Sequence, residues 1–126
     1  MKRLWIAASI LLFLLGSTLA NSYLLNRIIA DYTHQLTEAH RLAEADNWNA
    51  AAQLTAQVTE RWHEHDFYFH VMLPHRDIDE IHLTFQEVKE YLKLEEPDQY
   101  NAANAKLIAQ LGLLAEMEQL NWKNIL

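Results

Sequence analysis

Apolar residues recur every three or four positions along most of the chain, which is the spacing of one face of an α-helix. The first such run starts near the N-terminus and continues to about Ala45. Three further runs cover about 48–72, 78–92 and 100–117. We call the repeating positions of these three runs the helix seam, and its main members are Trp48, Val58, Trp62, His65, Phe69, Ile78, Ile81, Phe85, Val88, Leu92, Leu107, Leu111 and Leu114.

The connections between these runs are short. Asp46-Asn47 offers an N-cap for the second helix, Pro74 ends that helix, Asp77 opens the third and Asp98 caps the fourth. Two glycines and two prolines are too few for a sheet protein. We therefore predict an all-α fold, in which an N-terminal transmembrane helix continues into an antiparallel bundle of three to four helices. Residues 121–126 are expected to form an irregular tail.

The first 26 residues have the composition of a membrane anchor. Lys2 and Arg3 precede an uncharged run, Leu4–Asn26, which as a helix would be about 34 Å long and so would span the hydrocarbon core. A signal peptide cleaved after Ala20 is the alternative, because the densest apolar part is short. The unbroken helical stripe from Leu24 onward favours an uncleaved anchor.

The anchor divides the chain into residues 1–26, a signal-anchor or transmembrane helix, and residues 27–126, a helical domain. The two N-terminal cations favour the cytoplasmic side, so we expect a single-pass protein of the cell membrane with its C-terminal domain outside. From Arg27 onward, eight Lys/Arg and seventeen Asp/Glu give a formal net charge of −9. This charge argues against nucleic acid as a partner.

Residue types exclude much catalytic chemistry. Serine occurs only at Ser9, Ser17 and Ser22, and the chain has no cysteine, so the outer domain lacks both of these nucleophiles. No glycine-rich loop is present to hold a phosphate or a dinucleotide. We therefore expect neither enzymatic activity nor an organic cofactor.

Histidines are concentrated around the segment "RWHEHDFYFH", residues 61–70. His65 falls on the helix seam and is expected to be a core histidine with a hydrogen bond. Polar spacing near Pro74 also permits a zinc or copper site, while the plainer interpretation is two unrelated solvated faces. The weak metal candidates are His63, Asp66, His70, His75, Asp79 and His82.

Several short motifs, taken in order, resemble a known family. They are the cationic anchor, "DNWNAA", "ERWHEH", "HRDIDEIHLTFQEVKEYL" and the closing "NWKNIL". Together they are similar to domain-of-unknown-function family 4363, short single-anchor helical proteins of Gram-positive bacteria. The resemblance implies an anchored helical architecture, and it implies no activity, cofactor or catalytic residue.

Two functional hypotheses follow from the sequence. The first is a non-enzymatic, membrane-anchored extracytoplasmic interaction module, which binds a protein partner or a second copy of itself. The alternative is a metal- or pH-responsive bundle that uses the His/Asp cluster near the Pro74 bend. The pH version is motivated by the seven histidines, whose full protonation would cancel the net charge of −7.

Overall fold

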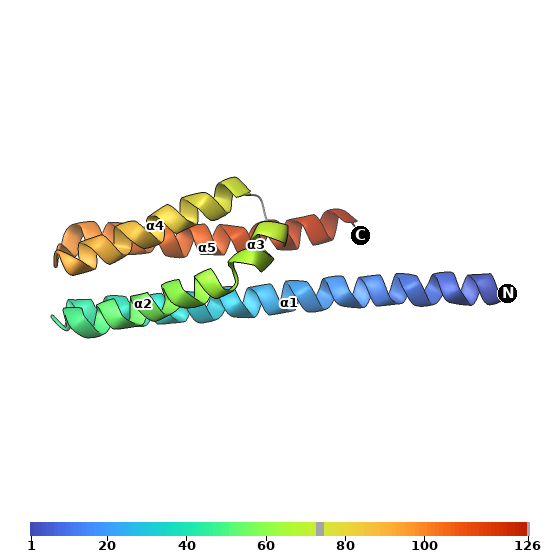
Figure 1. Cartoon of the computed structure of the whole chain (residues 1–126), viewed down its shortest axis with the longest axis horizontal. Coiled ribbons are helices and arrows are strands. Elements are labelled where there is room, and N and C mark those ends of the chain that lie inside the picture. The colour runs from blue at the N-terminus through green and yellow to red at the C-terminus, as the bar shows by residue number, and fades with distance from the viewer. Residues whose placement is uncertain (73–74, 126) are drawn as a thin grey trace.

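A computed structural model describes residues 1–72 and 75–125 of the chain, which form five helices with no strand among them (Figure 1). In chain order these are α1 (Lys2–Glu44), α2 (Trp48–Glu64), α3 (Asp66–Met72), α4 (His75–Lys93) and α5 (Pro97–Ile125). The predicted all-α class is confirmed. Pro74, which the sequence assigns to a bend, lies outside the described residues.

The four long helices form an antiparallel bundle. α1 packs against α2 and α5, and α4 packs against the same two helices, so the chain runs up and down through two adjacent hairpins (Figure 1). The N-terminal part of α1 extends well beyond the bundle. α3 lies at the end of the bundle from which that extension emerges.

The interior is built from the residues of the helix seam together with one face of α1. Eleven of the thirteen main seam positions are buried, while Trp48 and His65 are half-buried. α1 contributes Leu25, Ile29, Tyr32 and Leu36, which are at most 3% exposed. Each such aliphatic or aromatic side chain stabilises the fold by roughly 1.5–3 kcal/mol relative to its exposed state.

The second predicted helix is in fact two helices. The sequence pattern runs without interruption from Trp48 to Met72, but α2 ends at Glu64 and α3 begins at Asp66, with His65 as the C-cap between them. The apolar repeat survives this break because Trp62 and Phe69 still face the same core, with ring centroids 4.6 Å apart. Periodicity therefore predicted the burial and missed the break.

Three helix ends also differ from their predictions. α4 begins at His75 and not at Asp77, which lies in its first turn. α5 begins at Pro97, a residue favoured at the first helical position, so Asp98 lies inside the helix and is not its cap. The backbone of α5 stays helical to Ile125, so the expected irregular tail is wrong.

Candidate functional site

Asp66, His70 and His75 make a linked set of contacts where α3 is followed by α4. The Nδ1 atoms of His70 and His75 are 3.0 Å apart, and Asp66 Oδ1 lies 3.2 Å from Nε2 of His70. A carboxylate can only accept, so it favours a proton on His70 Nε2. In the neutral pair, His70 Nδ1 is then the acceptor and His75 Nδ1–H is the donor.

A second histidine pair joins α2 to α4. The rings of His63 and His82 are 4.7 Å apart between centroids and nearly perpendicular, at 73°. His63 is exposed and His82 is half-buried. The structure therefore divides five of the six metal candidates between two places, and the sixth, Asp79, is exposed on α4.

These contacts do not assemble a metal centre. Among residues 1–72 and 75–125, no group of three or more His, Asp or Glu side chains could hold a metal ion. The reason is visible at His70, because Asp66 contacts Nε2 whereas His75 contacts Nδ1. These two nitrogens point in different directions, so no single point is about 2 Å from all three donors.

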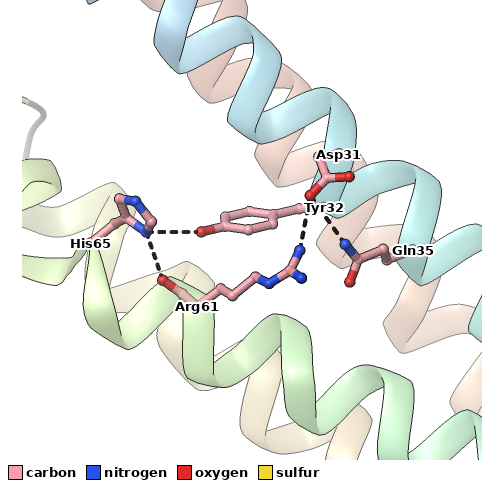
Figure 2. Close-up of polar contacts among 5 residues, drawn as sticks. All are labelled: Asp31, Tyr32, Gln35, Arg61 and His65. Atoms are coloured by element: carbon pink, nitrogen blue, oxygen red, sulfur yellow. Dashed lines mark hydrogen bonds and ion pairs between the residues drawn. The ribbon is translucent and has the colours of Figure 1, made fainter.

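His65 ties α2 to α1 (Figure 2). Its Nδ1 lies 2.9 Å from the carbonyl oxygen of Arg61 and 3.4 Å from the hydroxyl of Tyr32. A carbonyl oxygen only accepts, so Nδ1 carries the proton and donates to Arg61, with Tyr32 as a longer second contact. Burial raises the pKa of Tyr32 to about 12. This histidine is structural, and its hydrogen bond closes the last turn of α2.

An exposed polar contact lies beside this one. Arg61 Nη1 donates to Asp31 Oδ2 at 3.1 Å, and Gln35 Nε2 donates to the same oxygen at 3.0 Å (Figure 2). Both members of the Arg61–Asp31 ion pair are about half exposed, so the pair contributes little to stability.

The surroundings of α1 change abruptly along its length. The most apolar 18-residue window of α1 is long enough and apolar enough to cross a membrane, and none of it is buried. From Leu25 onward, every third or fourth residue of the same helix is buried in the bundle. Near this transition, the hydroxyl of Tyr68 on α3 donates to Asn21 Oδ1 at 3.5 Å. Sequence analysis missed this contact, because the partners lie 47 residues apart and each is an ordinary polar helix residue.

A surface groove of about 420 Å³ lies between α2 and α4, at the end of the bundle far from the exposed part of α1. It is open because small residues, Ala52 and Ala56, line one wall. Lys89, Lys93 and Glu95 stand on the other wall, next to Leu92. The groove therefore combines apolar side chains with two cations and one carboxylate, on a domain with a net charge of −9.

The fold and these contacts define a helical-bundle protein with one N-terminal helix able to cross a membrane. The sequence profile described as "Domain of unknown function (DUF4363)" matches residues 18–125, which is most of the chain. The protein therefore belongs to this family, as the sequence motifs indicated. Comparisons with curated proteins and with solved structures give no match.

Proposed function

We propose that the protein is a non-enzymatic interaction module, anchored by α1 in the cell membrane, with its bundle on the outer side. The observation that carries this proposal is that one unbroken helix, Lys2–Glu44, is exposed and apolar in its first half and packs one face into the bundle core in its second. An anchor joined without a linker fixes the bundle at a set height and orientation above the bilayer. Such a fixed position suits a protein that binds a neighbour at the membrane.

The groove between α2 and α4 is the proposed partner surface. Ala52 and Ala56 leave room for a side chain or helix of the partner. Lys89 and Lys93 outnumber the one carboxylate of the lining, Glu95, so the groove has a formal charge of +1 that complements acidic groups. A second copy of this acidic chain can supply such groups, and so can an acidic partner protein. No metal or organic cofactor is required for this role.

Orientation is tested by labelling single cysteines, because the natural chain has none. Gln86→Cys lies on an exposed position of α4, and Lys2→Cys lies at the other end of the anchor. A membrane-impermeant maleimide should label Gln86→Cys in intact cells and Lys2→Cys only after permeabilisation. The reverse pattern would contradict the outer location.

Partner binding is tested with a photo-crosslinking residue at Ala56, which lines the groove, in native membranes. The same residue at Gln57, exposed on α2 and absent from the groove lining, is the matched control. We expect a discrete crosslinked protein or a self-dimer from position 56 and none from position 57. If neither position gives a product, the interaction module has no support.

A pH-responsive bundle is the second candidate, favoured by the 3.0 Å contact between His70 and His75. Protonation of both rings would bring two N–H donors face to face and remove this hydrogen bond. The carboxylate of Asp66, 3.2 Å from Nε2 of His70, would at the same time gain an ion pair with the protonated ring. The hydrogen bond is worth about 1 kcal/mol and a half-exposed ion pair about 0–1 kcal/mol, so the two contacts oppose each other in acid.

Thermal melts at pH 7.5 and 5.5 test this second candidate. The change in melting temperature with pH should be smaller in His70→Gln than in the natural chain, while the exposed His34→Gln serves as the control. Equal pH dependence in all three proteins would remove the candidate.

Repeating the melts with zinc and with chelator tests the metal version of this candidate. A metal at a hundred times its dissociation constant adds about 2.7 kcal/mol, or roughly 10 °C. His70→Ala and His82→Ala should abolish any such rise.

A further inference from the structure

The short helix α3 has two apolar faces. Its inner face holds Phe69, which is fully buried and stacks on Trp62. Its outer face holds Phe67 and Val71, which are 82% and 65% exposed. These two residues are four positions apart, so they lie next to each other on one side of the helix. The inner face fixes α3 in the bundle, and the outer face presents a phenyl ring and an isopropyl group away from it.

The location of α3 indicates what covers this outer face. The hydroxyl of Tyr68 contacts Asn21 of α1, so α3 lies at the height of that residue. Figure 1 shows α3 at the end of the bundle from which the exposed part of α1 emerges. The C-terminal end of α5 lies at the same end and reaches further along α1.

The thickness of a bilayer places Asn21 at its outer boundary. A hydrocarbon core of about 30 Å needs about 20 helical residues. Counted from Leu4, the first apolar residue after Lys2 and Arg3, this length ends near Tyr23. Tyr23 and Leu24 are still 67% and 49% exposed, and burial in the bundle begins at Leu25. The helix therefore leaves the lipid at the level where α3 contacts it.

We propose that α3 is a second membrane contact, in which Phe67 and Val71 enter the boundary between head groups and acyl chains of the outer leaflet. The occupant of this face is lipid and not protein, because α3 contacts α1 at the height where that helix leaves the bilayer. The contact is apolar, so it does not require anionic lipid, which the acidic domain would repel. Together with α1 it would give the bundle two points of attachment and so restrict its tilt. This inference rests on the proposed membrane anchor.

Nitroxide labels on single cysteines test the inference in the full chain, reconstituted into phosphatidylcholine vesicles. Phe67→Cys and Val71→Cys report on α3. Leu83→Cys is the matched control, since Leu83 is 64% exposed but lies on the side of the bundle formed by α4. Leu12→Cys, at a position that is 68% exposed on α1, reports on the anchor. Unchanged helical circular dichroism in each variant shows that the fold is retained.

Collision with oxygen, which concentrates in lipid, is compared with collision with a water-soluble nickel complex. We expect the oxygen-to-nickel ratio at positions 12, 67 and 71 to exceed that at position 83 several-fold. If the ratio at positions 67 and 71 equals that at position 83 while position 12 has a high ratio, α3 lies in water. That result would overturn the inference and leave the anchor supported. If the labels at positions 67 and 71 are shielded from both reagents, they are packed against protein, and this result would also overturn the inference. Dipolar broadening of their spectra would identify that protein as a second copy of the chain. A water-exposed position 12 would overturn the anchor itself.

Discussion

At the residue scale, a small number of buried aromatic side chains control the bundle. Trp62 is fully buried and lies against Phe69 and Phe85, with ring centroids 4.6 and 5.6 Å away. These three residues come from α2, α3 and α4, so one cluster joins three helices. Tyr32 and Tyr100 place further rings in the core, from α1 and α5. Loss of one of these rings should therefore destabilise the whole domain.

Trp62→Ala should reduce the free energy of unfolding by about 3–5 kcal/mol, because it removes a large buried ring and leaves a cavity. Urea denaturation of the full chain in detergent, followed by far-ultraviolet circular dichroism, measures this loss. Phe67→Ala is the control, since that ring is 82% exposed and its removal should change stability by less than about 0.5 kcal/mol. Equal effects of the two substitutions would contradict the assignment of core and surface.

Burial raises the pKa of both Tyr32 and Tyr100 to about 12, from an ordinary value of 10.0. The neutral phenol is the form that the folded state favours, so its contribution to stability is complete below about pH 10. It is lost as pH rises through about 12. Absorbance at 295 nm should show a phase of tyrosine ionisation near pH 12, from Tyr32 and Tyr100, together with loss of helicity. Tyr32→Phe and Tyr100→Phe should each remove half of this late change; its persistence in both would contradict the assignment.

At the element scale, α1 and α4 end in the same way. Each is followed by a residue with positive φ, Asp46 at 61° and Glu95 at 54°. The amides of these residues donate to Ala43 and Leu92, and the next amides donate to Leu42 and Tyr91. This pair of hydrogen bonds is the Schellman motif, in which glycine usually occupies the positive-φ position. Asp46 thus belongs to the C-terminal motif of α1, while the side chain of Asn47 caps α2 by accepting from the amide of Ala50 at 3.4 Å.

Glu95→Gly should stabilise the protein even though it removes a side chain. A left-handed conformation costs an L-residue about 1–2 kcal/mol, and glycine removes this cost. Glycine also increases the conformational entropy of the unfolded chain, which destabilises the folded state by roughly 0.5–1 kcal/mol. The expected net gain is therefore a few tenths of a kcal/mol to about 1 kcal/mol. Glu96→Gly, one residue later at a position without positive φ, should destabilise. Chemical denaturation measures both, and the same sign for the two would refute the motif.

At the scale of the whole molecule, the continuity of α1 couples its exposed apolar half to the bundle. The helix has no break among its 43 residues, and its buried half packs against both α2 and α5. Any tilt of the exposed half must therefore move the bundle with it. A flexible tether would allow the domain to reorient freely, and this protein has no such segment between Lys2 and Glu44.

Rigid coupling predicts a single distance between the anchor and the bundle. Nitroxide labels at Leu12 and Thr37, both exposed on α1, are separated by 25 residues, or about 38 Å along a straight helix. Pulsed electron paramagnetic resonance in vesicles should give one narrow distribution near this value. Leu19→Pro in the same background should broaden and shorten it by kinking the helix. A broad distribution in the unmodified helix would show that the anchor is hinged.

The sequence by itself determined the helical class, the long apolar N-terminal helix and the family. These depend on local periodicity, apolar length and short motifs, which can be read along one segment at a time. Positions such as Val58, Phe85 and Leu111 fell on helix faces that the structure buries, because a bundle core needs one apolar side on each helix. The same local information placed several helix ends wrongly, since capping depends on backbone conformation.

Only the tertiary structure decided which distant residues meet. A spacing of three and then four residues on one predicted helix grouped His63 with Asp66 and His70. The helix breaks at His65, and the structure places His63 against His82 on α4 and His70 against His75. No local pattern encodes that break, because the apolar repeat continues through it. The position of α3 beside Asn21 is likewise set by a tertiary contact, between Tyr68 and Asn21, which are 47 residues apart in the chain. Contacts of this kind depend on how whole helices pack, and that packing is fixed by the shared core rather than by any single segment.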